Sequence, residues 1–540
     1  MRLNLLESLS DNIAIDKDKC VFCSICVNTC ILDNLRMKLA PCRQGCPLGV
    51  NCQGYVQLIA RGEEKQAMEI LRKDLPFPAI LGRVCSHPCE ETCHRKETEG
   101  DAVAIRNLKR YLADQFADEA IPLPEMQPDS GKTIAIVGSG PAGMMAAYDL
   151  RIQGHLVTIF DSEKEPGGML RWAIPDFRLP QSVLDKEMGL LADMGVSFQC
   201  NVAIGKDKTI EALKNEFDAV VVATGCPEHG LLHIAGEEKQ GVYHGLPFLK
   251  IVHEGKSPEI GEKVIVIGGG NVAVDSAQTA LRLGAKEVTM ATLESDKQLP
   301  AFPEAIESAA AEGIKFECSW GNPKLNFQDD RLIGIDFQRC VQVFDDCGCF
   351  APSFDDCELH YLDADTVIIA IGQQVDKAFL ESAGLIQDDK MAVDPLTLQA
   401  PNTPDEKVFV AGDTHKGPSS VIHALASGRE AAESVHRFLC GEHLRFGRAY
   451  PGPIETEFDI DTSGASLDKR IIVTEHHAKG KGDFQEIESS ITQEAARLEA
   501  KRCYSCGQPF GKFRTCWFCL PCEVECPNDA LKVKIPYLLR

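Results

Sequence analysis

The chain has 540 residues, enough for about three to five domains with full hydrophobic cores. Its hydrophobic fraction of 44% and charged fraction of 25% are typical of a globular protein in water. The formal net charge of -24 argues against a nucleic-acid partner, because phosphates would repel such a surface. No run approaches the roughly 18 apolar residues of a membrane helix, and the first residues turn polar too early for a secretory signal. We therefore expect a cytoplasmic protein without a membrane span.

Sixteen of the 24 cysteines lie near the two ends of the chain. In a reducing compartment, clustered C-x2-C spacing indicates metal ligation rather than disulfides. This spacing lets three thiolates of one loop bind a 4Fe-4S cluster, while the fourth cysteine binds the same cluster or a neighbouring one. Two runs have the spacing C-x2-C-x2-C-x3-C: the first comprises Cys20, Cys23, Cys26 and Cys30, and the second comprises Cys516, Cys519, Cys522 and Cys526.

A further C-x2-C pair, Cys503 and Cys506, precedes the second run. Combined with Cys516 and Cys519, this pair has the spacing of a zinc ribbon, so zinc and an iron–sulfur cluster compete for the same thiolates. We favour the iron–sulfur cluster at the C-terminus, because the second run is complete without the extra pair.

The chain between these ends changes character at Thr133. Residues 1–130 are loop-rich around their cysteines, with helices expected over 57–72 and 104–116. From residue 133 to about residue 440 the pattern is strand, turn and helix, which is typical of a parallel α/β sheet.

A first glycine-rich loop follows the apolar strand expected over 133–137. Its glycines allow a tight turn, close approach of the backbone to a pyrophosphate, and packing of a helix whose N-terminus faces the phosphates. A second strand over 157–160 ends at Asp161, whose carboxylate can accept hydrogen bonds from ribose hydroxyls. The loop residues are Gly138, Gly140, Pro141, Ala142 and Gly143.

A second glycine-rich loop follows the strand expected over 263–267. A helix through Leu283 and a strand over 287–291 complete another βαβ unit. Two such units imply two dinucleotides, a fixed flavin and an exchanging nicotinamide, and a flavin converts a hydride into single electrons for clusters. The loop residues are Gly268, Gly270, Asn271, Val272 and Ala273.

The residues after the strand over 287–291 discriminate between the two nicotinamide coenzymes. An NADP site uses arginines here to bind the 2′-phosphate. This chain has Leu293 and Glu294, and Glu294 would repel a phosphate and accept from a free ribose hydroxyl. We expect NAD(H) in preference to NADP(H), although Arg282 and Lys297 lie close enough in the sequence to leave a phosphate site open.

Further motifs follow the first loop in a characteristic order. They are Pro166-Gly167-Gly168-Met169-Leu170, Ile174-Pro175-Asp176-Phe177-Arg178, Ala223-Thr224-Gly225, Ala370-Ile371-Gly372-Gln373 and Ala411-Gly412-Asp413. Over roughly residues 35–440 this set resembles the glutamate synthase small (β) subunit family of FAD/NAD(P)H iron–sulfur oxidoreductases. That family includes the large subunit of NADH-dependent ferredoxin:NADP oxidoreductase.

The resemblance implies an α/β fold with two Rossmann-like domains of the glutathione-reductase type, in which the NAD(P) domain is inserted into the FAD domain. It also implies an N-terminal helical iron–sulfur domain, to which the second cysteine run adds a small C-terminal ferredoxin-like domain. The expected domains are 1–130 (iron–sulfur), 131–245 (FAD), 246–364 (NAD(P)), 365–440 (FAD), 441–500 (linker and helix) and 501–540 (iron–sulfur).

The resemblance also assigns roles around the cofactors, while the reaction itself is left to the flavin and no catalytic side chain is expected. Residues along the flavin would be Gly167, Gly168, Met169 and Leu170, with Ile174 and Arg178 near its ring system. Thr224 and Gly225 would close the first FAD crossover, Gly412 and Asp413 would bind the ribityl–phosphate arm, and Ser420 and Val421 would open a helix whose N–H groups face the flavin. Gly372 and Gln373 would close over the bound nucleotide.

For the N-terminal cysteines the resemblance implies two 4Fe-4S clusters. Cys42 and Cys93 would join one cluster with upstream cysteines. Cys46, Cys85 and Cys89 would join the other, with either Cys30 or a non-cysteine side chain as fourth ligand. The run from Cys20 to Cys30 exceeds this requirement, so we expect two or three N-terminal clusters and one C-terminal cluster. Cys52 receives no role.

Together these features predict an FAD-dependent NAD(P)H oxidoreductase that works as the flavin iron–sulfur subunit of a larger complex. The expected partners are other electron-transfer subunits, with ferredoxin a candidate. The favoured version is a transhydrogenase or electron-bifurcating complex that couples NAD(H), NADP(H) and ferredoxin. The alternative is the reductase subunit of a glutamate synthase or of a formate dehydrogenase or hydrogenase complex, and a non-catalytic scaffold is the least favoured interpretation.

Overall fold

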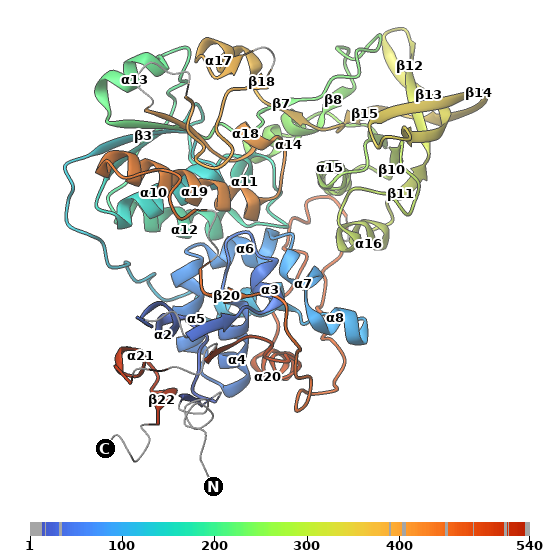
Figure 1. Ribbon diagram of the computed structural model, residues 1–540. Coiled ribbons are helices and arrows are strands. Elements are labelled where there is room, and N and C mark those ends of the chain that lie inside the picture. The colour runs from blue at the N-terminus through green and yellow to red at the C-terminus, as the bar shows by residue number, and fades with distance from the viewer. Residues whose placement is uncertain are drawn as a thin grey trace. The chain divides into compact units, whose positions relative to one another are not determined.

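The computed structural model describes residues 13–16, 18–31, 35–387, 390–401, 407–448, 452–478, 480–511, 516 and 518–534. The chain forms two compact units (Figure 1). Unit 1 comprises Met1–Ala120, Arg445–Thr474 and Ser490–Arg540, and unit 2 comprises Ile121–Leu444 and Glu475–Ser489. The stretch 441–500, expected from the sequence to be a linker and a helix, is thus divided between the two units.

The first sheet of unit 2 is parallel, with the strand order β19-β6-β3-β4-β5. Its strands are apolar because helices cover both faces, and Ile134, Ile136 and Val221 are fully buried. Helices α10 (Pro141–Ile152) and α19 (Val421–Cys440) pack against each other. The strands are β3 Thr133–Val137, β4 Leu156–Phe160, β5 Ser197–Gln199, β6 Ala219–Val222 and β19 Val408–Val410.

The second sheet of unit 2 is also parallel, with the order β11-β10-β9-β15-β8. It lies between β6 and β19 in the sequence, so the second nucleotide domain is inserted into the first, as predicted. The strands are β8 Val242–His244, β9 Lys263–Ile267, β10 Glu287–Thr292, β11 Lys315–Cys318 and β15 Thr366–Ile369, and the helices beside them are α14 Gly245–His253, α15 Asn271–Leu283 and α16 Pro303–Ala311.

Three long antiparallel strands extend from the second sheet (Figure 1). They are β12 Trp320–Gln328, β13 Arg331–Phe344 and β14 Phe350–Asp363, and their inner ends share a core with β9 and β15. Cys347 and Cys349 lie exposed in the turn between β13 and β14. The smaller elements of unit 2 are α11 Met169–Trp172, α12 Gln181–Asp193, α13 Ile210–Glu216, β7 Glu228–His229, β16 Gln373–Gln374, α17 Lys377–Ser382, β17 Ile386–Gln387, β18 Lys390–Met391 and α18 Asp413–Lys416.

Unit 1 is built around short helices. The single helix expected over 57–72 is wrong, because α4 (Cys52–Arg61) ends at Gly62, whose φ of 80° is left-handed, and α5 starts at Glu64. The helix expected over 104–116 is confirmed as α9. The remaining helices of unit 1 are α2 Ile25–Asn28, α3 Pro41–Gln44, α5 Glu64–Asp74, α6 Pro78–Val84, α7 Pro88–Glu91, α8 His94–Glu99, α9 Ile105–Gln115, α20 Gln493–Ala500 and α21 Pro521–Val524.

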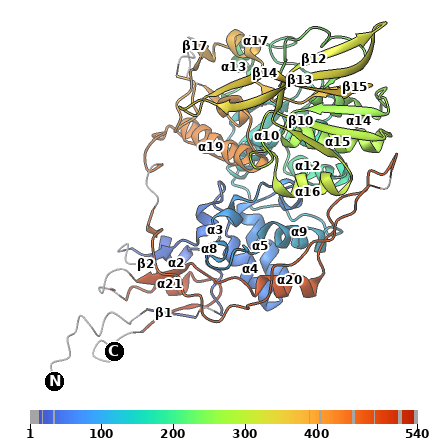
Figure 2. The same cartoon turned by 90° about the vertical axis from the view of Figure 1, so that its right-hand side faces the viewer.

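Two small sheets of unit 1 join the N-terminal and C-terminal segments of the chain (Figure 2). In one, β1 (Ile13–Ile15) pairs with β22 (Leu531–Val533). In the other, β2 (Leu35–Lys38) lies between β20 (Ile454–Glu455) and β21 (Gln508–Gly511). Throughout the described ranges of both units, every helix is too short or too polar to traverse a lipid bilayer.

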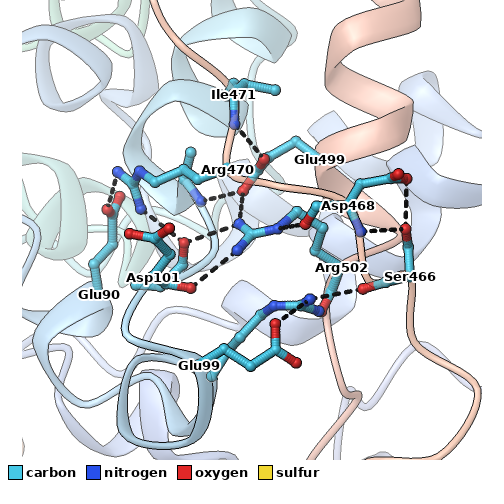
Figure 3. Close-up of polar contacts among 12 residues, drawn as sticks. Glu90, Glu99, Asp101, Ser466, Asp468, Arg470, Ile471, Glu499 and Arg502 are labelled. Atoms are coloured by element: carbon cyan, nitrogen blue, oxygen red, sulfur yellow. Dashed lines mark hydrogen bonds and ion pairs between the residues drawn. The ribbon is translucent and has the colours of Figure 1, made fainter.

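A buried ion-pair network fixes α20 within unit 1 (Figure 3). Glu499 and Arg502 are 0% and 1% exposed and form an ion pair of 2.6 Å. The second oxygen of Glu499 accepts from the backbone N–H of Ile471 at 2.9 Å, and the first also accepts from that of Ala104 at 2.8 Å. Arg470 pairs with Glu90 at 2.6 Å. The network therefore ties three segments that are distant in sequence to the residues directly before Cys503.

Candidate functional site

The first glycine-rich loop has the backbone that close approach of a pyrophosphate requires. Gly138 follows β3 with a φ of 106°, and a side chain there would overlap the carbonyl group of Ala223. A side chain at Gly143 would overlap the carbonyl oxygen of Gly138, so the helix and loop touch through glycine alone. At Gly140 an added Cβ would meet only Gly168, at 3.9 Å. The N–H groups of Gly138 and Ser139 donate within the protein, to the Phe160 carbonyl and to Asp161, so the N–H groups in the first turn of α10 are the ones expected to bind a pyrophosphate.

Asp161 follows β4 and faces this loop. One carboxylate oxygen accepts from the backbone N–H of Ser139 at 2.8 Å and from the Ser139 hydroxyl. The other accepts from the N–H of Glu163 at 2.9 Å. A carboxylate has about four acceptor positions, so Asp161 can brace the loop and still accept from a ribose hydroxyl.

The other predicted FAD motifs converge on the same loop. Gly168 has a φ of 55° and approaches Gly140 so closely that a Cβ would lie 2.7 Å from its Cα. Gly412 is equally tight against Ala142. The N–H of Gly225 donates to the Thr414 hydroxyl at 2.7 Å, which joins the Thr224-Gly225 and Gly412-Asp413 motifs. All these segments meet at the carboxyl ends of the strands, where open α/β sheets bind nucleotides.

The N-terminal half of α19 lies beside the Gly412 turn, because a Cβ added at Gly412 would lie 4.0 Å from that of Ala424 in the first turn, and the Ser427 hydroxyl accepts from the N–H of Gly412 at 2.8 Å. Ser420 makes no capping hydrogen bond to the helix, and its hydroxyl instead pairs with Nδ1 of His423 at 2.8 Å. The N–H groups that open this helix, from Val421 onward, therefore offer partial positive charge to a bound group.

Arg178 connects the two nucleotide domains of unit 2. Its guanidinium donates to both carboxylate oxygens of Asp275 in α15, at 2.8 and 2.9 Å. Burial raises the pKa of Asp275, whereas the charge of Arg178 lowers it. The expected position of Arg178 near the flavin rings stays a prediction, since its charge is already matched by Asp275.

Residues 475–489 cross both nucleotide domains. The N–H of Ile487 donates to the Phe177 carbonyl at 2.8 Å, and the N–H of Gly482 donates to the Arg282 carbonyl at 2.7 Å. Arg282 is fully buried, pairs with the fully buried Glu312 at 2.6 Å, and covers the ring of Phe177 at 4.0 Å. Arg282 is therefore not accessible to a 2′-phosphate. Of the two cations that the sequence offered for binding the 2′-phosphate of NADP, only Lys297 is left.

The second glycine-rich loop has the same geometry as the first. Gly268 has a φ of 137°, and a side chain there would overlap the carbonyl oxygen of Ala370. A Cβ built on Gly269 would lie 3.0 Å from Oε2 of Glu294, so this carboxylate lies beside the loop. Asn271 accepts from the N–H of Phe302 at 3.1 Å through its side-chain oxygen. The carboxylate of Glu294 thus lies beside the second loop, and its role as a ribose hydroxyl acceptor stays a prediction.

The motif at Gly372 and Gln373 follows the end of β15. Gly372 has a φ of 120° and its carbonyl accepts from the N–H of Gly230 at 3.1 Å. Gln373 pairs with His229 across the β16–β7 ladder. These contacts hold together the two chain segments that link the first nucleotide domain to the second, one leading out of the first domain and one leading back into it.

The cysteines of unit 1 gather in groups, one of which surrounds a lysine. Lys109 in α9 is 6% exposed. Burial lowers the pKa of Lys109, but nearby cysteines outweigh this effect and raise it above its ordinary value. These cysteines are Cys85, Cys89, Cys52 and Cys46. Cys52, to which the sequence gave no role, is the fourth member, and its side chain contacts those of Cys42 and Cys89.

A second group combines cysteines from both ends of the chain. Cys93 is the neighbour whose charge acts on both Cys503 and Cys506, and Cys42 in turn faces Cys93 and Cys503. Cys42 and Cys93 thus lie near the C-terminal pair Cys503 and Cys506, and their assignment to a cluster with upstream cysteines stays a prediction. Helix α20 packs on α4 and leads directly into the Cys503 loop. The backbone carbonyl of Cys503 accepts from the Gln57 side chain at 3.4 Å.

The remaining cysteines of the two C-x2-C-x2-C-x3-C runs also lie close together. A cavity of unit 1 is lined by Cys20, Cys23, Cys26 and Cys526, and Cys522 faces Cys30, Cys516 and Cys519. The zinc ribbon is not assembled, because Cys503 and Cys506 lie with Cys93 while Cys516 and Cys519 lie with Cys522. Among the described residues, no three His, Cys, Asp or Glu side chains are placed to hold a single metal ion.

The cysteine loops have a backbone that suits thiolates bound to a cluster. In four loops the residue two positions after a cysteine has a positive φ, from 39° to 56°, and donates its N–H to that sulfur at 3.3–3.4 Å. Non-glycine residues adopt this conformation only where the surroundings enforce it. Hydrogen bonds to sulfur are one determinant of cluster potential. The donors are Phe22, His87, Ser505 and Phe518, which bond Cys20, Cys85, Cys503 and Cys516.

Without a metal these buried thiols would stay protonated. Burial, reinforced by neighbouring thiols, raises the pKa of Cys20 to about 11 and that of Cys26 to about 12. Thiolate ligands must lose their protons, so the sites favour cations that displace them. Soft thiolate sets select iron–sulfur clusters or zinc, and the cysteine groups fit clusters better than a single ion.

Comparison with known proteins decides the family. A family model described as pyridine nucleotide-disulphide oxidoreductase matches residues 132–428. The chain belongs to this family. A second model, described as dihydropyrimidine dehydrogenase domain II with a 4Fe-4S cluster, matches residues 8–121. The protein is therefore an FAD-dependent NAD(P)H oxidoreductase with an N-terminal 4Fe-4S domain, which confirms the resemblance, the fold class and the enzyme class predicted from the sequence.

Two similar proteins match most of the chain. The "NADP(+)-dependent formate dehydrogenase subunit beta" of Moorella thermoacetica is 33% identical over 86% of this chain and 70% of that protein. The "NAD-dependent dihydropyrimidine dehydrogenase subunit PreT" of Escherichia coli is 32% identical over 74% of this chain and 92% of that protein. Among solved structures, FprA from Mycobacterium tuberculosis in complex with NADPH covers 58% of this chain and 85% of its own, with 20% identity and a TM-score of 0.51, which supports the shared fold.

Proposed function

We propose that this chain is the flavin iron–sulfur subunit of a multi-subunit oxidoreductase. It exchanges hydride between a nicotinamide nucleotide and FAD, and single electrons between FAD, its clusters and partner subunits. The observation that carries the proposal is the combination of two complete nucleotide loops in unit 2 with sixteen grouped cysteines in unit 1. A bound flavin supplies the conversion between two-electron and one-electron chemistry.

The chain's own residues bind and orient the two nucleotides. The glycines at positions 138, 140 and 143 bring backbone amides to a pyrophosphate, and Asp161 accepts from the ribose. The start of α19 places positive charge where the flavin ring gains negative charge. Arg178 and Asp275 maintain the alignment of the two nucleotide domains.

The test of this function is an anaerobic titration of the purified protein with NADH and, separately, NADPH. Absorbance near 450 nm reports the flavin. We expect one of the two nucleotides to reduce the flavin, so that its absorbance falls within the time of a single turnover. A scaffold that holds FAD only for structure would keep its absorbance with both nucleotides, and that result would eliminate the proposed function.

We further propose that NAD(H) is the preferred nicotinamide. Glu294 lies beside the loop that binds the pyrophosphate, and Arg282 is fully buried with Glu312. The names of the relatives differ on this point, because one specifies NADP(+) and another NAD. The preference of this chain therefore depends on its own residues at the ribose.

Replacing Glu294 by arginine should move the preference towards NADPH. The substitution exchanges a repulsive charge for an attractive one, and we expect the ratio of kcat/KM for NADPH over NADH to rise by at least about 10-fold, equivalent to about 1.4 kcal/mol. Asp296→Arg, an exposed charge change in the same loop, is the matched control and should leave the ratio almost unchanged. An equal response of both variants would remove Glu294 from the account.

For the complex, we propose a transhydrogenase or electron-bifurcating assembly that couples NAD(H), NADP(H) and ferredoxin. The alternative, a reductase subunit of a formate dehydrogenase, is favoured by the name of one relative. Anaerobic purification from the native host distinguishes them. Co-elution of a second flavin subunit supports the first version, and co-elution of a formate-oxidising subunit supports the alternative.

Lys109 should set the potential of the cluster proposed for Cys46, Cys52, Cys85 and Cys89. A buried positive charge favours the reduced, more negative cluster. We expect Lys109→Met to lower its midpoint potential by on the order of 100 mV, as for a unit charge several ångströms away at an effective dielectric constant of about 20. A spectroscopic redox titration measures the shift. Lys65→Met, on the surface of unit 1, should leave all potentials unchanged.

A further inference from the structure

The two C-x2-C-x2-C-x3-C runs occupy equivalent positions in the fold. β1 ends at Ile15 and β21 ends at Gly511, each five residues before the first cysteine of its run. β2 and β22 then start at Leu35 and Leu531, each five residues after the fourth cysteine. Each run is therefore enclosed by two short strands at the same spacing, although the runs lie at opposite ends of the chain.

The turns described within the two runs match at two positions. Phe22 and Phe518 have φ values of 55° and 56°, and each donates its N–H to the sulfur two residues earlier at 3.4 Å. Ser24 and Leu520, with φ values of 65° and 71°, each precede a four-residue helix that carries the third cysteine. Four non-glycine residues in left-handed conformations at equivalent positions indicate that both loops are shaped for the same ligand.

The strands pair between the runs and not within them. β1, before the first run, is antiparallel to β22, which follows the second. β2, after the first run, is antiparallel to β21, which precedes the second. Helices α2 and α21 are also in contact. The two runs thus form the halves of one small domain with approximate twofold symmetry.

The fourth cysteine of the second run lies with the first run. The cavity lined by Cys20, Cys23 and Cys26 is completed by Cys526, whose sulfur accepts from the N–H of Ala530 at 3.2 Å. Cys30, whose sulfur accepts from the N–H of Leu35, packs against a buried cluster that contains cysteines of both runs, Cys20, Cys26 and Cys522. Because β2 and β22, which follow Cys30 and Cys526, each pair with a strand of the opposite run, the same exchange is expected for Cys30.

We propose that the two ends of the chain form one two-cluster ferredoxin module with exchanged ligands. Cys20, Cys23, Cys26 and Cys526 bind one 4Fe-4S cluster, and Cys516, Cys519, Cys522 and Cys30 bind the other. A fourth cysteine that ligates the neighbouring cluster is a known property of two-cluster ferredoxins. Here the two halves come from opposite ends of one chain, so neither run binds its cluster alone. This inference does not depend on the nicotinamide preference or on flavin reduction.

Cysteine alkylation of the full-length, anaerobically purified protein tests the exchange. Thiolates bound to a cluster resist iodoacetamide, and peptide mass spectrometry measures the reaction at each cysteine. In Cys30→Ala we expect Cys516, Cys519 and Cys522 to become at least about 10-fold more reactive, whereas Cys20, Cys23 and Cys26 stay protected. In Cys526→Ala the pattern should reverse. Each variant should lose about four iron atoms per chain.

Reaction of cysteines in the same run as the substitution, in either variant, would overturn the exchange, because a self-contained run loses its own cluster. Reaction of all eight thiols in the unsubstituted protein would overturn the module itself. Cys347→Ala, at the exposed β13–β14 turn, is the matched control and should change neither the iron content nor the protection of the two runs. FAD content, determined in every variant, reports the nucleotide domains separately.

Discussion

Replacing Gly143 by alanine is expected to deprive the protein of FAD. The added methyl group would overlap the carbonyl oxygen of Gly138. Gly138 is the residue at which the chain turns from β3 into the loop proposed to bind the pyrophosphate. Neither atom can yield without moving either β3 or α10. Overpacking of this kind costs about 1–3 kcal/mol or more, so we expect the dissociation constant of FAD to rise by about 10-fold to 100-fold. Flavin fluorescence after release from the purified protein measures the loss.

Gly189→Ala provides the control for this substitution. Gly189 lies within α12 of the same unit, and a Cβ there would meet no atom within 4 Å. Alanine is favoured over glycine in a helix by up to about 1 kcal/mol, so this variant should bind FAD normally and be slightly more stable. Equal FAD binding by the two variants would contradict the assignment of the first loop to the pyrophosphate.

Replacing Glu499 by glutamine should have the largest effect on stability. Glu499 is fully buried and neutralises Arg502, which is 1% exposed. Glutamine would leave that guanidinium without its counter-charge and turn an N–H group towards the N–H of Ile471. Breaking a buried pair costs about 3–5 kcal/mol. We expect that loss in the unfolding of unit 1, measured by urea denaturation, together with the loss of about four iron atoms from the adjacent Cys503 loop.

Glu494→Gln, an exposed carboxylate in the first turn of the same helix, should cost less than about 1 kcal/mol. The contacts of Glu499 in Figure 3 all belong to unit 1, so the FAD content of the Glu499 variant should stay normal. Loss of FAD in parallel with iron, or a stability equal to that of Glu494→Gln, would contradict a structural role for this network in holding the Cys503 loop.

The nucleotide domains were predictable because their determinants are local. Gly138 and Gly268 stand directly after apolar strands and Gly143 lies in the first turn of the helix that follows, and each glycine is required by an atom only a few residues or one strand away. Asp161 and Glu294 follow the next strand at the expected distance, and the structure places both beside their loops. Local spacing alone therefore located this part of the site.

The grouping of the cysteines was not predictable from spacing, because it depends on which strands and helices pair. Cys52 opens α4 and does not belong to a C-x2-C motif, so nothing in the sequence marked it. Cys503 and Cys506 meet Cys93 only because α20 packs on α4, more than 400 residues away in the chain. The spacing of each run left open whether its fourth cysteine binds the same cluster or the neighbouring one, and only the pairing of β1 with β22 and of β2 with β21 favours the proposed exchange.

Arg282 shows how tertiary structure overrides a charge argument. Its proximity in the sequence to the second nucleotide loop made it a candidate for a phosphate. In the structure Glu312 and residues 475–489 bury it. Glu312 lies 30 residues away in the sequence and the segment 475–489 about 200, so neither contact could be predicted from the residues of the loop.

We expect electrons to pass within this one chain, from a nicotinamide through the flavin to the chain's own clusters. Rapid freezing after anaerobic mixing with excess NADH, followed by electron paramagnetic resonance, tests this claim most directly. We predict that reduced-cluster signals appear as the flavin absorbance falls, and that Gly143→Ala abolishes both. Flavin bleaching while every cluster stays oxidised, or cluster reduction in protein that lacks FAD, would contradict the account.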